Sequence, residues 1–575
     1  MPIKFRRLRR GLWLFIILLT LSPLTSPALA QINLPANDGL EYYHRLLQVS
    51  GIAGDHSSFT LRPVTPDSKI SARHPWQANI YYDQPPLNFM PVDLGELNFY
   101  EPVWFQSYNT RLPRGTNDGA VWQGRGYNTA ISAGFKTTYG PLHIQFRPQI
   151  GMAQNSEFDL GPYDPPMISA SSQDYRGEAS EFAYRDFRGS IDYVQRYGDE
   201  TYSWADLGHS SVELRYYGFR IAYSNTPIWS GPAVHTSLHF GYSAPGFQHL
   251  YLGTYRPQKT PIGAFEWAYI FGGTHKSDYF DIDGEFPRRQ SVNSLIVSYS
   301  PRFLNGLTLG AVRTFFHPFP SSFSEYRGQA SKLFEAVVRA GLRSEDNPSG
   351  YDPDNQLASG FIRWILPEAG LEIYGEYGRN DHNVDFRDFR LQPNHHRAYS
   401  LGMIKTLVLP KNRFLGLNLE INQLEAMRTT ITRGNNHLGG WYTHTQQVLG
   451  FTNRGQIMGT GYGPGMNMQM LKADLYDPAG RISIKLARIA YHNSRVDQYF
   501  RFIEEVNPAD VEHSEVRNFE FLAGAEATAF LKYGIELTAS LEQSFIFNHH
   551  NIRGNDITNT RLELILRKQI RGWKR

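Results

Sequence analysis

The stretch Leu142-His143-Ile144-Gln145-Phe146-Arg147 alternates apolar and polar side chains. The same two-residue period returns at residues 371–374, 415–422, 482–486 and 535–542. Successive side chains of a β-strand point to opposite faces, so this period indicates strands with one polar and one apolar face. Many such strands in a chain of 575 residues without cysteine favour an all-β fold, a closed antiparallel transmembrane β-barrel in a bacterial outer membrane.

The first 30 residues have the pattern of an export signal. Residues 4–10 carry five basic side chains, and residues 11–21 form an apolar core that is too short to span a bilayer. Ala28-Leu29-Ala30 supplies the small residues of a cleavage site, so we expect cleavage after Ala30. The paired arginines also fit the twin-arginine route, but no cofactor motif follows, which favours the general secretory route.

The composition excludes several classes of protein. The signal's five basic residues account for the excess of 57 Lys and Arg over 54 Asp and Glu, so no basic surface for nucleic acid is expected. Mean hydropathy is −0.43, while aromatic residues make up 14%. Low hydropathy with many aromatic residues is typical of barrels, whose strands are apolar on one side and whose rims carry aromatic girdles. A secreted β-sandwich or propeller is the alternative, because alternation alone does not distinguish lipid from core.

Short and long connections alternate along the chain. The short ones are rich in Gly, Pro or Asn, as hairpin turns require, and fall at 138–141, 217–218, 301–306, 367–370, 410–413, 477–480 and 532–534. The long ones are polar and fall at 111–120, 152–208, 227–244, 272–290, 317–355, 380–397, 425–466, 492–516 and 548–558. This alternation predicts about 18 strands between Glu96 and Lys568, with short periplasmic turns and long extracellular loops.

The predicted organisation is a signal peptide over 1–30, an N-terminal periplasmic segment over 31–95 and the barrel over 96–571. In the N-terminal segment, Asn37-Asp38 can cap a short helix. We expect this partly helical segment to act as a plug or brace at the periplasmic mouth. The apolar face of the helix would hold Leu40, Tyr43, Leu46 and Leu47.

Two apolar rows near the C-terminus are assigned to lipid: Leu537, Ala539 and Leu541, and Leu562, Leu564 and Leu566.

The sequence gives no sign of an enzyme. It contains no Ser/His/Asp constellation with nucleophile-elbow spacing. The pairs His395-His396 and His549-His550 would point to opposite faces of a strand, and residues 381–385 do not have the spacing of a calcium loop. We therefore expect no catalytic residue, no metal site and no cofactor.

Four stretches differ from generic loop sequence. They are Asn117–Gly126, Ile191–Gly198, Trp229–Pro232 with Ser243–His249, and Trp441–His444 with Gly450–Gly455. In order and spacing they resemble the Wzi-type capsule assembly family, and the likeness runs from about Leu97 to the C-terminus. The resemblance implies an outer-membrane barrel that binds or organises capsular or exopolysaccharide at the cell surface, as a lectin and not an enzyme. Its expected partners are that polysaccharide, outer-membrane lipid and the polysaccharide export machinery.

Aromatic, basic and histidine side chains suit a sugar polymer, because rings cover the apolar sugar face and polar groups bind hydroxyls. The candidate polysaccharide-binding residues are Trp229, His235, Arg387, Arg390, Trp441, Tyr442, His444 and Arg454. With Arg397, the arginines could pair with the carboxylates of an acidic polymer. A structural role is the alternative for each: girdle aromatics, or loops that fold into the lumen and close it. The alternative function is a porin or an uptake channel for a small solute.

Overall fold

The computed structural model describes residues 39–54, 57–64, 73–77, 95–159, 200–277, 288–335, 354–380, 390–391, 396–425, 441–443, 447, 449–491, 517–549, 553–568 and 570. The chain divides into two compact units, 1–32 and 33–575. The first unit lies outside the described residues, so the export signal and its cleavage after Ala30 stay predictions. Everything below concerns the second unit.

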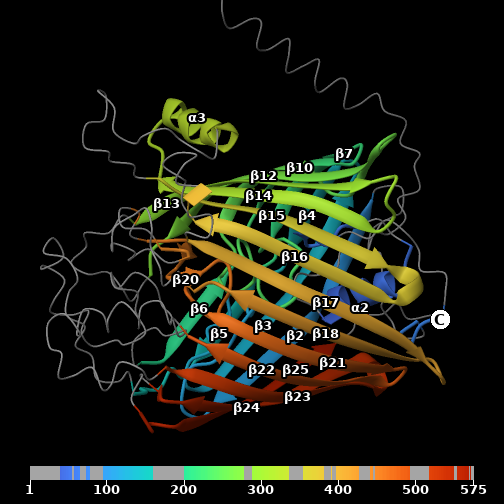
Figure 1. The fold of residues 1–575 in the computed structure, drawn as a ribbon, viewed down its shortest axis with the longest axis vertical. Coiled ribbons are helices and arrows are strands. Elements are labelled where there is room, and N and C mark those ends of the chain that lie inside the picture. The colour runs from blue at the N-terminus through green and yellow to red at the C-terminus, as the bar shows by residue number, and fades with distance from the viewer. Residues whose placement is uncertain are drawn as a thin grey trace, which may run out of the picture. The chain divides into compact units, whose positions relative to one another are not determined.

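The strands of this unit form a closed antiparallel barrel of 18 strands (Figure 1). The barrel closes because β2 (Glu96–Asn109) pairs with β3 (Gly126–Tyr139) on one side and with β25 (Ile557–Lys568) on the other. The expected strand number and the expected limits near Glu96 and Lys568 are confirmed.

Two barrel strands are each broken into two pieces. The first consists of β4 (Leu142–Phe146) and β5 (Gln149–Ala153), and the second of β6 (Tyr202–Asp206) and β7 (Ser211–Tyr216). Pro148 lies in the first gap and cannot donate a ladder hydrogen bond, which explains the interruption. The other strands are β8 (Phe219–Ser224), β10 (Gln248–Thr254), β12 (Gly263–His275) with the short β11 (Gln258–Thr260), β13 (Arg289–Pro301), β14 (Leu307–Pro318), β15 (Asn355–Leu366), β16 (Leu371–Asn380), β17 (Arg397–Leu409), β18 (Arg413–Gln423), β21 (Asn467–Asp477), β22 (Gly480–Ala490), β23 (Phe519–Leu531) and β24 (Ile535–Phe547).

All the expected short turns join neighbouring barrel strands at one rim. One further short connection was not expected: residues 255–262, between β10 and β12, with Pro257 and Pro261 as turn residues. Two of the short turns contain 3-10 helices, η4 (Pro367–Ala369) and η6 (Lys532–Gly534). Short turns mark the periplasmic rim of such barrels, so the opposite rim is the outer one.

The apolar rows assigned to lipid share the outer face of the barrel. Leu541 lies opposite Leu562, and Ala539 lies opposite Leu564, so the two rows form one band across β24 and β25. Leu541 and Leu562 are about half exposed when lipid is absent. The residues between them, such as Thr538, point inward.

Ala539→Arg is expected to lower the free energy of unfolding by roughly 2–4 kcal/mol, because it places a charge in the hydrocarbon. Ser540→Arg is the control. Ser540 points into the lumen and lies between Glu526 and Glu563 on the neighbouring strands, so an arginine there gains partners. Urea titration in detergent or liposomes measures both. Equal losses from the two variants would show that the sheet has no lipid face.

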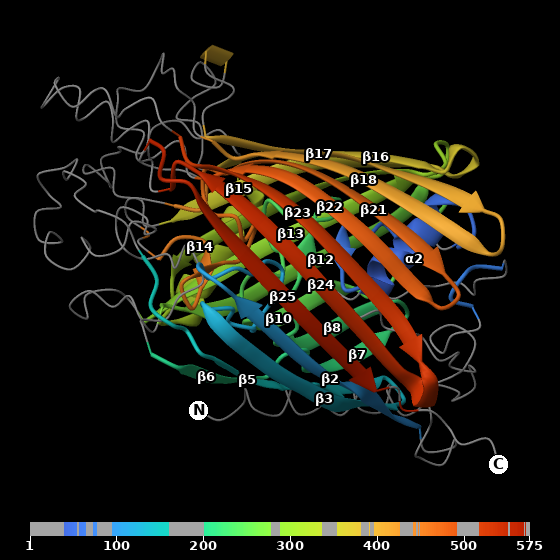
Figure 2. The same cartoon turned by 90° about the horizontal axis from the view of Figure 1, so that it is seen from below.

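In addition to the barrel strands, the chain forms the expected N-terminal helix, α2 (Gly39–Val49). Its residues Leu40, Tyr43, Leu46 and Leu47 are all buried. It lies inside the ring of strands (Figure 2) near the short-turn rim, where the Tyr43 ring is 4.7 Å from that of Tyr476. Among the described residues, no helix has the length and apolar character needed to cross a bilayer. The remaining elements are β1 (Leu61–Arg62), β9 (Trp229–Ser230), α3 (Phe323–Ser331), η3 (Lys332–Phe334), β19 (Thr452–Asn453) and β20 (Gln456–Ile457).

Candidate functional site

The connection between β8 and β10 folds into the barrel. Its β9 pairs with β1 of the N-terminal segment, so two parts of the chain that are distant in sequence meet in the lumen. Trp229 is 1% exposed. The Arg62 guanidinium lies 4.1 Å from the centre of its ring, and the ring of Tyr242 is 5.1 Å away. This tryptophan therefore holds the inward loop in place.

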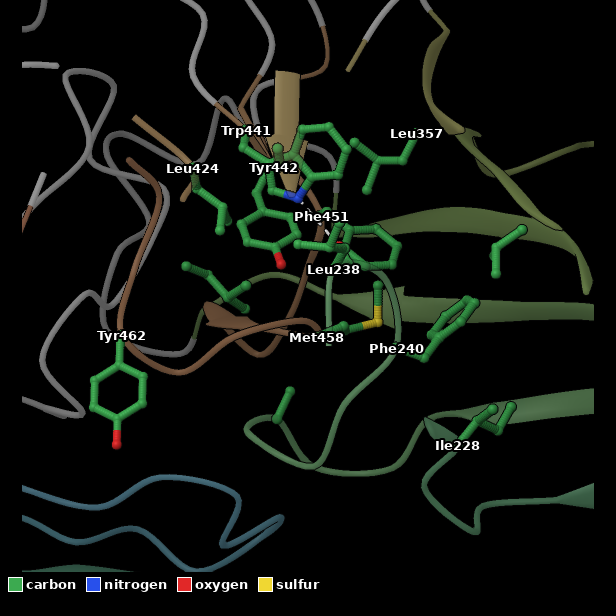
Figure 3. Close-up of a cluster of buried hydrophobic side chains, with 14 of the residues drawn as sticks. Ile228, Leu238, Phe240, Leu357, Leu424, Trp441, Tyr442, Phe451, Met458 and Tyr462 are labelled. Carbon is green, nitrogen blue, oxygen red and sulfur yellow. Dashed lines mark hydrogen bonds between the residues drawn. The ribbon is translucent and has the colours of Figure 1, made fainter. Parts of the chain in front are cut away.

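A hydrophobic cluster lies in the lumen beside this loop and occupies one side of it (Figure 3). Trp441 donates its indole N–H to the Leu238 carbonyl at 3.1 Å, and the Tyr442 hydroxyl donates to the Ser237 carbonyl at 3.2 Å. The ring of Tyr442 stacks on Phe451. The connection between β18 and β21 is thus packed against the loop between β8 and β10, and Trp441 and Tyr442 have almost no exposed surface.

One buried carboxylate anchors the tip of the inward loop. Glu420 on β18 accepts the backbone N–H groups of Val234, at 2.7 Å, and of His235 and Thr236. The Tyr374 hydroxyl donates to the same carboxylate at 2.7 Å. His235 adds a 2.8 Å hydrogen bond between Nε2 and the Asn418 side chain. His235 is therefore part of a clamp between loop and wall.

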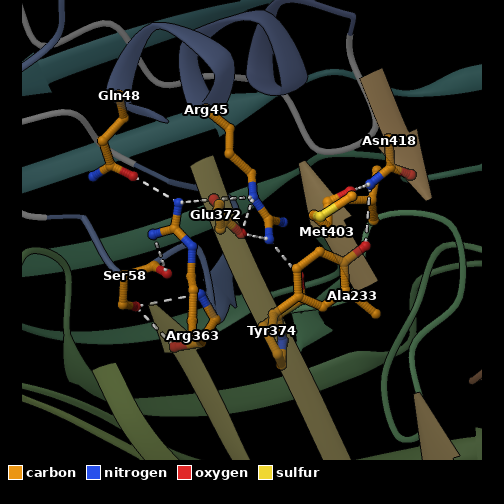
Figure 4. A network of polar contacts seen from close by, with 12 residues as sticks. Arg45, Gln48, Ser58, Ala233, Arg363, Glu372, Tyr374, Met403 and Asn418 are labelled. Carbon is orange, nitrogen blue, oxygen red and sulfur yellow. Dashed lines mark hydrogen bonds and ion pairs between the residues drawn. The ribbon is translucent and has the colours of Figure 1, made fainter. Parts of the chain in front are cut away.

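A second carboxylate joins the N-terminal segment to the wall (Figure 4). Glu372 on β16 pairs with Arg45 of α2 and with Arg363 of β15, the latter at 2.8 Å, and all three side chains are buried. Arg363 also donates to the Gln48 side chain at 2.7 Å, and Arg45 donates to the Pro232 carbonyl at 2.6 Å. We call Arg45, Gln48, Arg363 and Glu372 the latch, because they hold α2, the inward loop and the wall together.

The wall formed by β21 to β25 carries charges that face the lumen. Cations and carboxylates pair nearly one to one along it. The pairs include Arg481–Glu526, Lys485–Glu542, Arg561–Glu563 and Arg567–Glu536. Glu520 of β23 pairs with Arg114, which lies in the connection between β2 and β3. Several of these side chains keep partial exposure, so this side of the lumen is polar, unlike the side that holds the hydrophobic cluster.

The predicted site residues do not form one surface. Trp229, Trp441 and Tyr442 lie in the lumen as described, and His235 belongs to the clamp. Arg454 follows β19 in a two-residue hairpin turn, with φ of 53° followed by 76° at Gly455, and its guanidinium is 3.3 Å from Asp206. Arg390 is exposed. Arg387, His444 and the stretch Ile191–Gly198 lie outside the described residues. Direct contact of any of the eight with a polymer stays a prediction, and burial favours the structural role for the three rings.

Sequence reasoning missed an aromatic patch on the outer rim. The Phe323 and Phe334 side chains, on α3 and η3, are 77% and 78% exposed. Arg289 lies over the ring of the partly exposed Phe319 at 4.2 Å, and the Tyr326 hydroxyl is 3.0 Å from that of Tyr269. We call Phe319, Phe323, Tyr326 and Phe334 the rim patch. The signal that could have revealed it is the run of aromatic residues at the start of the 317–355 loop.

His239 is expected to make the inward loop sensitive to acid. Burial lowers the pKa of its imidazole from 6.5 to about 3, and Nδ1 lies 3.1 Å from the Thr314 hydroxyl. Between pH 6.5 and pH 3 the histidine is protonated in the unfolded loop but neutral in the folded loop, so acid favours unfolding. The loop's stability is therefore intact above pH 6.5 and falls as pH drops from 6.5 toward 3. We expect proteolysis of the loop to increase over that range. His239→Gln should reduce the dependence, and an unchanged pH profile in this variant would contradict the assignment.

No family model matches the sequence, and no characterised protein matches it by sequence. Among solved structures, Wzi of Escherichia coli, described as an outer membrane protein involved in group 1 capsule assembly and a carbohydrate-binding β-barrel, has 13% identity and a TM-score of 0.57 over 94% of this chain and 100% of its own. This chain has the fold of Wzi. The likeness that the sequence blocks predicted is thereby confirmed for the fold.

Porins match at lower scores. OprD of Pseudomonas aeruginosa has 9% identity and a TM-score of 0.36 over 82% of this chain and 96% of its own. A BenF-like porin from Pseudomonas fluorescens Pf-5 has 7% identity and a TM-score of 0.38 over 83% of this chain and 98% of its own.

Proposed function

We propose that this protein binds or organises capsular or exopolysaccharide at the outer surface of the bacterium. The observation that carries the proposal is that inward connections pack around a hydrophobic cluster in the lumen, while exposed aromatic and basic side chains lie on the outer rim. Connections that fold into the lumen and pack there suit a protein that presents a surface better than one that passes a solute. The shared fold with Wzi, described as a carbohydrate-binding barrel, supports the same reading.

The rim patch is the surface that we assign to the polymer. The Phe323 and Phe334 side chains are largely exposed, and aromatic rings of this kind cover the apolar face of a sugar. Arg289 begins β13 at the outer rim and Arg390 lies in the connection between β16 and β17. Both are exposed cations that can pair with carboxylates of an acidic polymer. We assign direct contact with the polymer to these residues, because Trp229, Trp441 and Tyr442 are buried.

The test is the double variant Phe323→Ala and Phe334→Ala. Each stacking contact is worth roughly 0.5–1.5 kcal/mol, so the pair should weaken polymer binding about 5- to 150-fold. We expect polysaccharide to appear in the culture medium while its total synthesis is unchanged. The measurement is the ratio of cell-bound to released polysaccharide in cells that carry equal amounts of assembled barrel.

Phe303→Ala with Tyr533→Ala is the matched control. These aromatic side chains are 78% and 85% exposed, but they lie on turns of the opposite rim. The control variant should retain polymer as wild type does. Equal shedding by both double variants, or by neither, would remove the rim patch as the binding surface.

A transport function is the second candidate, because the wall from β21 to β25 presents charged side chains to the lumen, as a pore would. Planar-bilayer recording of the purified wild-type protein separates the two functions. Silence is the expected result for the polysaccharide-binding protein. Steady openings of porin size would favour a channel for a small solute.

A further inference from the structure

Helix α3 and the 3-10 helix η3 lie against the side of the barrel wall that faces away from the lumen. Along β12, Ala268 and Ile270 belong to the lumen cluster, so the alternate residues Tyr269 and Phe271 point outward. Tyr326 of α3 contacts both: its hydroxyl is 3.0 Å from that of Tyr269, and its ring centre is 4.6 Å from that of Phe271. The helix therefore covers the outside of the wall and not the mouth of the barrel (Figure 1).

The same segment covers polar side chains of the wall. By the same alternation, Ser291 of β13 and Arg313 of β14 point away from the lumen cluster. The Ser291 hydroxyl donates to the Gln329 side chain at 3.0 Å, and Arg313 donates to the Leu333 carbonyl at 3.1 Å. Polar groups are costly against hydrocarbon, so α3 and η3 take the place of lipid over this part of the wall.

The lipid face of the barrel leads directly to this segment. Leu309 of β14 pairs with Ile362 of β15 and shares a face with Arg313, but it lies nearer to the short-turn rim. Leu309, Ile362 and Val297 of β13 are exposed when lipid is absent. The segment from α3 to η3 thus lies at the outer end of an apolar band, where it borders the outer leaflet of the membrane.

The rim patch places aromatic and basic groups at this boundary. Phe323 and Phe334 are its most exposed side chains, Arg289 lies over Phe319, and Arg327 of α3 is exposed as well. Aromatic rings are favoured at the boundary between lipid and water, and arginine pairs with phosphate and carboxylate. A glycolipid presents sugars, anionic groups and acyl chains at this boundary, whereas a polymer in solution lacks the acyl chains.

We propose that the rim patch binds a glycolipid of the outer leaflet and thereby holds a lipid-linked form of the polysaccharide. Its sugars lie on the rings of Phe323 and Phe334, and the anionic groups next to the lipid pair with Arg289 and Arg327. The inference rests on the proposed function, because it names the class of saccharide that the same surface retains. It goes beyond that function in making the membrane part of the binding site.

Binding of fluorescent lipopolysaccharide to the purified full-length barrel in detergent, measured by anisotropy, tests the proposal. The competitors are unlabelled lipopolysaccharide, the water-soluble saccharide that mild acid releases from it, and dioleoylphosphatidylglycerol. Lipopolysaccharide should bind, and the other two should compete at least about tenfold more weakly, because each lacks one half of the ligand. Absence of binding, or equal competition by the released saccharide or by the phospholipid, would overturn the proposal.

Variants locate the binding on the rim patch. Phe323→Ala with Phe334→Ala should weaken lipopolysaccharide binding about 5- to 150-fold. Phe303→Ala with Tyr533→Ala, on turns of the opposite rim, is the matched control and should leave it unchanged. Equal weakening by both would contradict the site. If the rim-patch variant sheds polysaccharide from cells but binds lipopolysaccharide as wild type does, this inference fails while the proposed function stands; if it sheds none, the proposed function fails.

A spin label measures the position of the patch without any ligand. The chain contains no cysteine, so a single introduced cysteine carries one label. In phosphatidylcholine liposomes, a label at Phe323→Cys should be relaxed more by oxygen, relative to a water-soluble nickel chelate, than a label at Arg553→Cys in the connection between β24 and β25. Leu541→Cys in the lipid band gives the upper limit. A ratio at position 323 equal to that at position 553 would place the rim patch in water and overturn the proposal.

Discussion

Glu372→Ala is expected to release the N-terminal segment from the lumen and to lower the free energy of unfolding by about 3–5 kcal/mol. The variant removes the carboxylate shared by Arg45 and Arg363, whose side chains are each 1% exposed. Two buried cations then lack their counter-charge, and the penalty of that state exceeds the value of the ion pairs themselves. Thermal unfolding in detergent measures the loss, and limited proteolysis between Gly39 and Arg62 measures the release.

Asp477→Ala is the control on the same rim. Arg413 pairs with Asp477 at 2.9 Å, but these side chains are 48% and 38% exposed, so solvent screens them. The expected loss is about 0–1 kcal/mol. If Glu372→Ala and Asp477→Ala behave alike, the latch does not hold the N-terminal segment, and α2 must be retained by its apolar face alone.

The wall of the barrel could be predicted from the sequence because its determinants are local. The alternation at 535–542 sets which side chains face lipid, and the turn residues at 477–480 set where the chain reverses. Pro148 breaks a strand without changing the order of the strands. Such signals act over a few residues, and the cross-strand partners follow from them once the hairpins are in place.

The interior of the lumen could not be predicted in the same way. Arg45 and Glu372 are 327 residues apart in sequence, and the alternation of polar and apolar residues does not encode their contact. Trp229 and Trp441 lie in polar, glycine-containing connections, where an aromatic residue looks the same whether it faces a sugar or a protein core. The sequence thus locates the connections that carry these aromatic residues, but it does not show whether their rings point into the lumen or toward solvent. Phe323 and Phe334 went unnoticed for the converse reason: they are exposed but belong to no motif.

Replacing Trp229–Ala244 by a short Gly/Ser linker is expected to open a conducting channel through the barrel. An 18-stranded barrel is wide enough for an aqueous channel when nothing fills it. The replacement removes Leu238 and Phe240 from the hydrophobic cluster. It also removes β9, the partner of β1, and the Pro232 carbonyl that Arg45 uses, so the N-terminal segment loses two of its attachments as well. Planar-bilayer recording should then show steady openings.

The matched control deletes α3 (Phe323–Ser331), a largely exposed helix on the outer rim. Since α3 lies outside the lumen cluster, its loss should leave the barrel silent. The control thereby separates opening of the lumen from the general effect of a shortened loop. A loop-replaced variant that assembles as a heat-modifiable barrel and stays silent would mean that the connection between β18 and β21, with Trp441 and Tyr442, closes the lumen unaided. Equal conductance in wild type and in the loop-replaced variant would show that the packed interior is no barrier, and the channel function would then replace the polysaccharide-binding one.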